Sequence, residues 1–236
     1  MDGQDCDTVG QRVEFVLAQI RLAAQAAGRR DESVRLVAAT KTVPVSRIRE
    51  AITAGLRFAG ENRLQEALPK IDALAGEPIT WHFIGRLQRR KAREVVGRFA
   101  LIHSVDSLEL ADEIDKRAGA AGLQQEILLE INVGDEPTKG GFHPTQLHGA
   151  LAHVSRLPHV RVKGLMAIPP PVADAEMARP YFRRLRDLAR QAAERSIPSV
   201  SLDELSMGMS NDYLVAIQEG ATLVRVGTAL FGARHG

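Results

Sequence analysis

The sequence has little of what several protein classes require. Cys6 is its one cysteine, which excludes an internal disulfide and a metal cluster held by cysteines. No apolar run reaches transmembrane length, and residues 1–5 lack the basic and apolar regions of a signal peptide. The histidines His143, His148 and His153 show no metal-binding spacing. We therefore expect a soluble cytoplasmic protein without a metal ion.

An excess of one charge is also missing. The chain has 31 Lys and Arg residues against 29 Asp and Glu residues, a formal net charge of +2. This near balance argues against a protein that binds nucleic acid or membranes mainly by its charge. The basic stretch from Arg86 to Arg93 is expected to be a solvated helix face, and a docking site for an acidic partner or RNA is the alternative.

The composition is that of a globular protein. With 236 residues, of which 44% are hydrophobic, the chain can bury a sizeable core. No stretch rich in Pro, Gly or Ser divides it, and Pro169-Pro170-Pro171 predicts only a rigid loop. We expect a single domain over residues 1–236, preceded by an extra helix at about 8–27 that Thr8 and Gln11 cap.

Strand and helix patterns then alternate along the chain. Strands are predicted at 34–40, 56–59, 79–84, 99–103, 126–133, 161–165, 200–207 and 222–226, and helices at 46–54, 61–74, 87–96, 106–119, 145–155, 174–195 and 211–219. Gly55, Gly76, Gly97 and Gly119 are expected to stop helices. Eight such units predict a (β/α)8 barrel of parallel strands. No Gly-x-Gly-x-x-Gly follows the first strand, which weakens a dinucleotide-binding alternative.

Lys41 stands at the end of the first predicted strand. A lysine at the exit of a buried strand needs water, an anion or a reactive partner for its ammonium group. In a closed cleft, desolvation lowers the pKa of the amine and favours imine chemistry. A surface lysine in a strand-to-helix loop is the alternative. Glu61, expected near Lys41, is either a base or a salt-bridge partner.

The ends of strands seven and eight form a second candidate group. In such barrels these two loops are a frequent phosphate site. Hydroxyl groups of Ser206, Ser210 and Thr228 lie there, and Gly227 permits backbone N–H groups to approach an anion. A lysine for an imine, a phosphate cradle and Arg225 facing a ring nitrogen together suggest pyridoxal 5′-phosphate (PLP). A phosphate-binding barrel without PLP remains a further alternative.

Motifs throughout the chain resemble one family. They are Leu36–Val43, Phe58–Asn62, Trp81–Gln88, Ile102–Asp106, Gly164–Met166, Leu205–Asp212 and Val224–Gly232. In order and spacing they are similar to those of the pyridoxal phosphate homeostasis proteins. The resemblance implies one alanine-racemase-like (β/α)8 barrel, the type III fold of PLP proteins. The chain departs from the family pattern at Arg90, where asparagine is usual, and at Leu214, where glutamate is usual.

The resemblance also implies a set of cofactor contacts. Lys41 would carry PLP as a Schiff base, and Arg225 would lie near the ring nitrogen. Phosphate contacts are expected around Ser206, Ser210, Gly227 and Thr228, and Asn62, Met166 and Met207 are expected beside the cofactor.

The implied function is intracellular homeostasis of PLP (vitamin B6) without established turnover, in a monomer or weak homodimer with PLP-dependent enzymes as recipients. The alternative is a fold type III PLP enzyme such as an amino-acid racemase. Racemases of this type add a β-domain with a catalytic tyrosine. This sequence ends at Gly236 and its tyrosines, Tyr181 and Tyr213, fall outside the predicted strand ends. We therefore expect no catalytic residues in the enzymatic sense.

Overall fold

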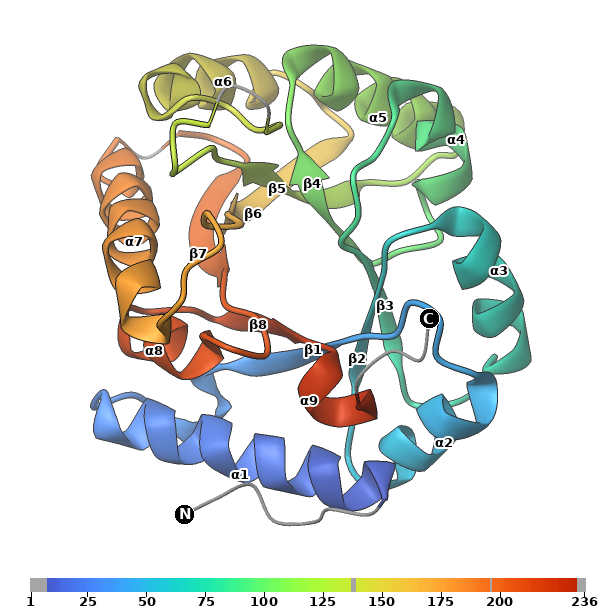
Figure 1. Ribbon diagram of the computed structural model, residues 1–236. Helices are drawn as coiled ribbons and strands as arrows, with labels where there is room; N and C mark the ends of the chain where they lie inside the picture. Colours follow the sequence, from blue (N-terminus) through green and yellow to red (C-terminus); the bar gives the residue numbers. More distant parts are fainter. Residues whose placement is uncertain (1–7, 137–138, 196, 233–236) are drawn as a thin grey trace.

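The computed structural model describes residues 8–136, 139–195 and 197–232. Its centre is a closed barrel in which eight parallel strands follow one another in chain order and β8 pairs with β1 (Figure 1). The strands are β1 (Arg35–Ala39), β2 (Phe58–Glu61), β3 (Thr80–Phe83), β4 (Leu101–Val105), β5 (Gln125–Glu130), β6 (Val160–Met166), β7 (Val200–Ser206) and β8 (Leu223–Val226).

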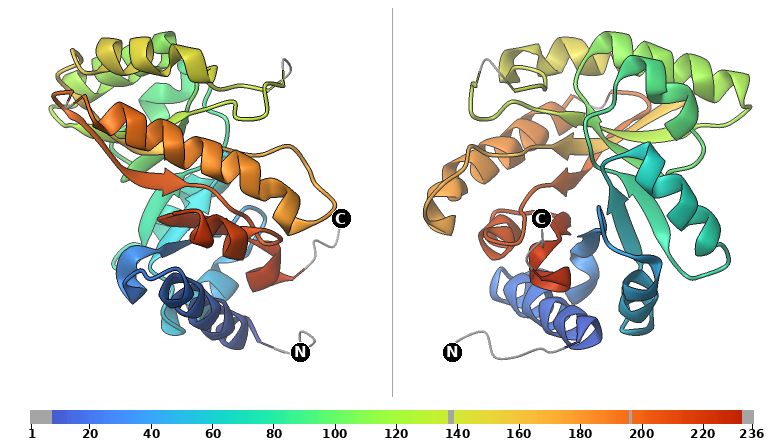
Figure 2. Two further views of the ribbon diagram at one scale, coloured as in Figure 1. Left: turned by 90° about the vertical axis from the view of Figure 1, so that its left-hand side faces the viewer. Right: turned by 45° about the vertical axis from the view of Figure 1, so that its right-hand side comes forward.

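Helices surround the barrel, as Figure 2 shows from two further sides. They are α1 (Val9–Ala26), α2 (Val45–Thr53), α3 (Leu64–Ala73), α4 (Ala92–Val95), α5 (Leu108–Ala120), α6 (Leu147–Val154), α7 (Arg179–Ala193), α8 (Tyr213–Gln218) and α9 (Thr228–Phe231). Short 3-10 turns lie at Asp31–Ser33, Arg89–Lys91, Pro144–Gln146 and Ala175–Ala178. The predicted barrel is confirmed, and its strands begin and end within three residues of the predicted ranges. The helices predicted at 87–96 and 174–195 begin later, at Ala92 and Arg179, because a 3-10 turn precedes each of them.

The extra helix before β1 completes the helical ring. Helices α2 to α8 each follow one strand, whereas β8 is followed only by the short α9. Helix α1 packs against α8 on one side and α2 on the other, and so covers the β8–β1 junction (Figure 1). Its predicted capping box is present: the Thr8 hydroxyl accepts the Gln11 N–H, and the Gln11 side chain accepts the Thr8 N–H, each at 3.2 Å.

One predicted helix stop is wrong. Gly119 lies inside α5, which continues to Ala120, and the left-handed residue beyond it is Gly122 with φ 67°. Gly119 has a packing role instead, because a Cβ there would lie 2.7 Å from Cδ2 of His159. The short α9 was not predicted, since four residues after a strand carry no detectable periodicity.

The core has two parts. The larger part lies between the outer face of the sheet and the helices. The smaller part fills the barrel with Val37, Ile84, Leu101, Leu128, Met166 and Leu223. Polar side chains, His82, His103, Ser206 and Arg225 among them, are also buried at 5% exposure or less. The interior of this barrel is therefore partly polar, which directs attention to the end where those groups lie.

Two classes of feature are absent from the described ranges. No helix there is long and apolar enough to cross a membrane. No group of three or more His, Cys, Asp or Glu side chains is arranged to hold a metal ion.

Candidate functional site

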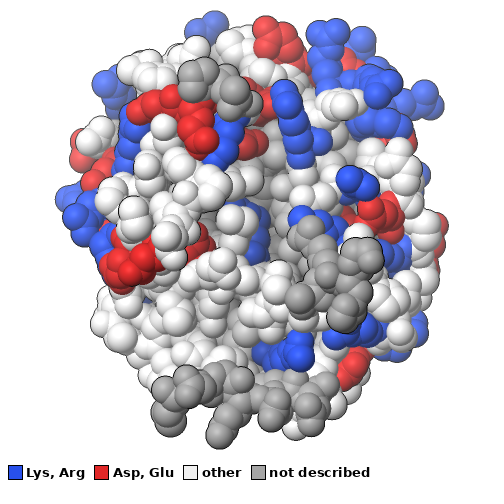
Figure 3. Space-filling view, in the orientation of Figure 1, with Lys and Arg blue, Asp and Glu red and all other residues white. Residues whose placement is uncertain are grey.

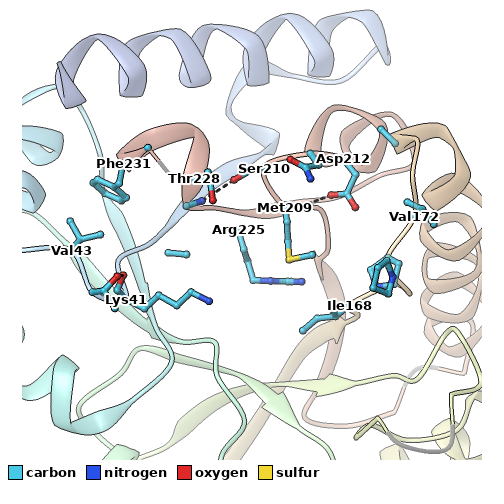
Figure 4. A pocket seen from close by; sticks show the side chains of 18 of the residues that line it. Lys41, Val43, Ile168, Val172, Met209, Ser210, Asp212, Arg225, Thr228 and Phe231 are labelled. Atoms are coloured by element: carbon cyan, nitrogen blue, oxygen red, sulfur yellow. Dashed lines mark hydrogen bonds between the residues drawn. The ribbon is translucent and has the colours of Figure 1, made fainter. Parts of the chain in front are cut away.

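A pocket of about 800 Å³ opens at the carboxyl ends of β1, β6, β7 and β8. It is lined by Ala39, Lys41, Thr42, Val43, Pro44, Arg47, Lys139, Ile168, Pro169, Pro170, Pro171, Val172, Ala173, Ala175, Met209, Ser210, Asn211, Asp212, Arg225, Gly227, Thr228, Phe231 and Gly232. Figure 4 shows the Lys41 and Arg225 side chains extending into this space from neighbouring strands. The pocket lies at the end where barrels of this kind hold their ligands.

The backbone on both sides of Lys41 is held by helix α3. Nζ of Lys70 donates to the carbonyl of Thr40 at 2.7 Å, and a carboxylate oxygen of Glu66 accepts the N–H of Thr42 at 3.0 Å. Thr42 has a φ of 62°, a conformation that non-glycine residues seldom adopt. These contacts fix the direction in which the chain leaves β1, and with it the origin of the Lys41 side chain.

Glu61 at the end of β2 is the centre of that support. Its side chain is fully buried, and one carboxylate oxygen accepts hydrogen bonds from Lys70 Nζ and the Thr40 hydroxyl, both at 2.7 Å. A buried carboxylate requires such partners. Of the two roles left open by the sequence, the geometry gives Glu61 that of a salt-bridge partner.

Ser210 joins the loops after β7 and β8. Its hydroxyl oxygen accepts the N–H groups of Gly227 at 3.2 Å and Ala229 at 3.4 Å (Figure 4). No described residue accepts the proton of this hydroxyl, which leaves it for an acceptor in the pocket. The carboxylate of Asp212 accepts the N–H of Met209 at 2.6 Å and so closes the turn that contains Ser210. The Ser210 hydroxyl is thus held in place on this wall by the backbone of the β8 loop, with its proton directed to the pocket.

Arg225 is buried at the base of the pocket. One terminal nitrogen donates to Oγ of Ser206 at 2.5 Å, and the other donates to the carbonyl of Ala167 at 2.9 Å. Burial lowers the pKa of the guanidinium to about 10, although the negative charges of Glu130 and Asp212 act to raise it. Burial also raises the pKa of both those carboxyl groups. Even so, the guanidinium is a cation at neutral pH.

The structure brings five of the predicted cofactor residues to the pocket lining: Lys41, Ser210, Arg225, Gly227 and Thr228. The other four are not among the described lining residues. Ser206 and Met207 are completely buried behind the lining, and Met166 belongs to the barrel interior. Asn62 is packed under Gly85, and its buried Oδ1 has no hydrogen-bond partner in the described chain.

Several lining residues were missed by the sequence reasoning. Met209, 40% exposed, lines the pocket, whereas Met207 is fully buried in the larger core. Pro169-Pro170-Pro171 was predicted only as a rigid loop, yet it forms one wall. Its position directly after a barrel strand was the available signal. The contact of His103 with Ser206, the partner of Arg225, had no sequence signal.

The basic stretch lies away from this pocket. Arg86, Arg89, Arg90 and Arg93 are exposed, and Figure 3 shows Lys and Arg gathered over the region of α4 and α5. Lys91 pairs with Glu94 at 2.8 Å and Arg86 approaches Asp106 at 3.9 Å. These exposed contacts agree with a solvated face.

Comparison with known proteins gives concordant results. The profile of the family described as alanine racemase, N-terminal domain, matches residues 16–235. The pyridoxal phosphate homeostasis protein of Aquifex aeolicus is 49% identical over 95% of this chain and 97% of its own. The structure of PipY from Synechococcus elongatus with PLP bound is 39% identical, with a TM-score of 0.84 over 95% of this chain and all of that one.

A more distant likeness concerns the fold alone. Alanine racemase from Clostridium difficile has a TM-score of 0.73 at 15% identity, covering 95% of this chain and 56% of the racemase. The barrel, the family profile and the full-length relatives agree. The chain belongs to the alanine racemase N-terminal domain family and, within it, to the pyridoxal phosphate homeostasis proteins.

Proposed function

We propose that this protein binds PLP as a Schiff base on Lys41 and acts in PLP homeostasis without turning over a substrate. One observation carries the proposal: the Lys41 amine, the Arg225 guanidinium and the Ser210 hydroxyl line one pocket. PipY, similar over nearly the full length, has a structure with PLP bound, which supports the assignment.

The chemistry of the lining fits this cofactor. Ser210, Gly227 and Thr228 would hold the phosphate, because the hydroxyl groups of Ser210 and Thr228 suit a dianion and Gly227 has no side chain to keep the phosphate away from the backbone. Arg225 would face the ring nitrogen. Asn62, Met166, Ser206 and Met207 would support these contacts from behind, and the unpaired Oδ1 of Asn62 offers one further acceptor.

The same residues favour storage over catalysis. Bound PLP supplies an aldehyde that condenses with amines and a ring that withdraws electrons. Arg225 opposes protonation of the ring nitrogen, because like charges repel, and so weakens that withdrawal. Racemisation needs proton-transferring groups on both faces of the reacting carbon. Neither Tyr181 nor Tyr213 is among the described lining residues, which argues against the racemase alternative.

The test is an absorbance spectrum with added PLP, followed by borohydride reduction and peptide mapping. We expect one reduced adduct, on Lys41, and its loss in Lys41→Ala. Lys163→Ala is the matched control, since Lys163 pairs with Glu126 at 3.7 Å and is not among the described lining residues. Adducts scattered over surface lysines would overturn the assignment. Racemisation of an amino acid that Lys41→Ala abolishes would establish the enzyme instead.

The remaining expectations follow from the same proposal. We propose that the protein works in the cytoplasm, that PLP-dependent enzymes are the recipients of its cofactor, and that it is a monomer or weak homodimer. Light scattering across a range of concentrations measures the oligomeric state directly. Transfer is measured by activation of a cofactor-free PLP enzyme, with Lys41→Ala as the control donor.

A further inference from the structure

A chain of hydrogen bonds runs through the barrel interior behind Arg225. The Arg225 guanidinium donates to Oγ of Ser206 at 2.5 Å, and Oγ lies 2.8 Å from Nδ1 of His103. Nε2 of His103 lies 3.0 Å from Nδ1 of His82. The four residues come from β8, β7, β4 and β3, so this chain crosses the barrel.

The direction of donation follows from the chemistry of the end groups. Arginine can only donate, so Ser206 Oγ is an acceptor toward Arg225. The Ser206 proton then needs its own acceptor, because a buried hydroxyl without one costs about 1–3 kcal/mol. Nδ1 of His103 is the one acceptor within hydrogen-bond distance among the described residues. His103 is therefore the Nε2–H tautomer and donates to Nδ1 of His82.

Burial and charge keep both histidines neutral. His103 is fully buried, and its pKa is lowered by burial first, then by the charges of His82, Arg225 and Arg35. Burial lowers the pKa of His82 to about 3, with Arg35 adding to the effect. Arg35 is itself paired with Glu204, and Phe58 packs on the His82 ring at 5.5 Å. A protonated His103 could not accept from Ser206, so neutrality preserves the chain of bonds.

We propose that Ser206 and His103 are positioning residues that hold Arg225 with its remaining donors facing the pocket. The guanidinium has five N–H groups, and two of its hydrogen bonds, to Ser206 and to the Ala167 carbonyl, tie it to β7 and to the end of β6. No carboxylate in the described chain forms an ion pair with it. Its orientation therefore depends on neutral partners, and His103 holds one of them, the Ser206 hydroxyl. The inference rests on the proposed function, since the group to be faced is the PLP ring.

The first test does not involve PLP. Nitrogen-15 NMR of the histidine rings in the cofactor-free protein reports which ring nitrogen carries the proton, and His103→Asn assigns the His103 signals. We expect Nε2–H in both His103 and His82, unchanged from pH 6 to pH 9. A proton on Nδ1 of His103 would overturn the proposal, whatever the protein does with PLP.

The second test measures PLP affinity in a matched pair of variants. His103→Leu removes the acceptor for Ser206, whereas His103→Asn places an amide oxygen close to the position of Nδ1. We expect up to about tenfold weaker PLP binding in His103→Leu, the upper end of the range for a lost hydrogen bond between neutral groups. His103→Asn should recover binding to within about threefold, and the Lys41 adduct should persist in both.

The outcomes separate the two proposals. Equal affinity in His103→Leu and the parent, both folded by circular dichroism, overturns the positioning role and leaves the Lys41 assignment intact. Weakening to the same degree in both variants also overturns it, because that pattern means a general loss of packing. A parent protein without a Lys41 adduct refutes the proposed function itself, and the NMR result then still decides the direction of the hydrogen bonds.

Discussion

Arg225 is a buried cation whose hydrogen-bond partners are neutral. Its pKa of about 10 means that the charged form is less favourable in the folded chain than in the unfolded one, by roughly 3 kcal/mol. Arg225→Met removes this penalty and leaves the Ala167 carbonyl without a donor, which costs about 1–3 kcal/mol. We therefore expect the free energy of unfolding of the cofactor-free protein to stay equal or rise by up to about 2 kcal/mol, measured in urea at pH 7, while PLP binding weakens.

Arg29→Met is the matched control for this prediction. Arg29 donates to three backbone carbonyls, those of Ser33, Ile217 and Ala221, and so joins the start of β1 to the loop before β8. Its removal leaves all three without that donor, and we expect a loss of about 2 kcal/mol or more. A comparable loss in Arg225→Met would contradict the view that Arg225 serves the ligand more than the fold.

Gly208 gives a second prediction at this scale. It follows β7 with a φ of 89°, and a Cβ there would lie 2.5 Å from the Cβ of Ala216. Gly208→Ala should lower the free energy of unfolding by about 2–4 kcal/mol through backbone strain and overpacking. Gly149→Ala is the control, because Gly149 is inside α6 with nothing near its missing Cβ, and it should stabilise by about 0.5–1 kcal/mol. Thermal unfolding of the pair distinguishes the two effects.

Among the elements, α3 is joined to β1 and β2 by charge as well as by apolar packing. Lys70 is the cation beside the fully buried Glu61 carboxylate. Lys70→Met leaves that charge unpaired, and we expect a loss of about 3–5 kcal/mol in the free energy of unfolding. The double variant Lys70→Met with Glu61→Leu should recover most of the loss, because an apolar pair requires no counter-charge. Urea unfolding of the three proteins measures the coupling.

An exposed pair provides the comparison. Lys91 and Glu94 are 2.8 Å apart, close to the 2.7 Å of Lys70 and Glu61, but their side chains are 33% and 43% exposed. Lys91→Met should therefore change the free energy of unfolding by less than about 1 kcal/mol. If Lys70→Met cost no more than Lys91→Met, the Glu61 carboxylate would not depend on Lys70, and the view that this ion pair joins α3 to β2 would be wrong. The PLP affinity of Lys70→Met also reports whether the support of Lys41 depends on this ion pair.

The order of the elements was predictable because each strand–helix unit carries local signals. Apolar runs marked the strands, and Gly55, Gly76 and Gly97 marked helix ends with positive φ. Gly119 misled because its small size serves a contact with His159, a residue 40 positions away in sequence. A pattern within one helix cannot reveal such a partner. The short α9 was missed for another reason, because four residues are too few to show a helical period.

The candidate site was predictable only in part, for a related reason. Lys41, Arg225 and Ser210 lie at strand ends, and a closed barrel brings strand ends together whatever its register. The register decides the rest: it places Ser206 toward Arg225 and His103, and Met207 toward the outer core. A change of one residue exchanges the two faces of a strand, so these contacts depend on the closed sheet.

For the whole molecule, the buried histidines determine how stability depends on pH. The ordinary pKa of histidine, 6.5, applies in the unfolded chain, while that of His82 in the folded chain is about 3. Between these values the unfolded chain binds a proton that the folded chain does not, so stability falls as pH falls. His103 acts in the same direction. Glu130 and Asp212, whose pKa values are raised by burial, act in the opposite direction at acid pH.

We therefore expect the free energy of unfolding to decrease from pH 6.5 to pH 4.5 by at least about 2 kcal/mol more in the parent than in the double variant His82→Gln with His103→Asn, because His82 alone contributes that much and His103 adds to it. Each mismatched proton contributes about 1.4 kcal/mol per pH unit, and the full slope is reached only below 6.5. Urea unfolding at pH 6.5, 5.5 and 4.5 measures the two slopes. All carboxyl groups are common to both proteins, so the difference belongs to the histidines. Equal slopes would mean that His82 and His103 take up protons inside the folded barrel, which the hydrogen bond from Ser206 forbids for His103.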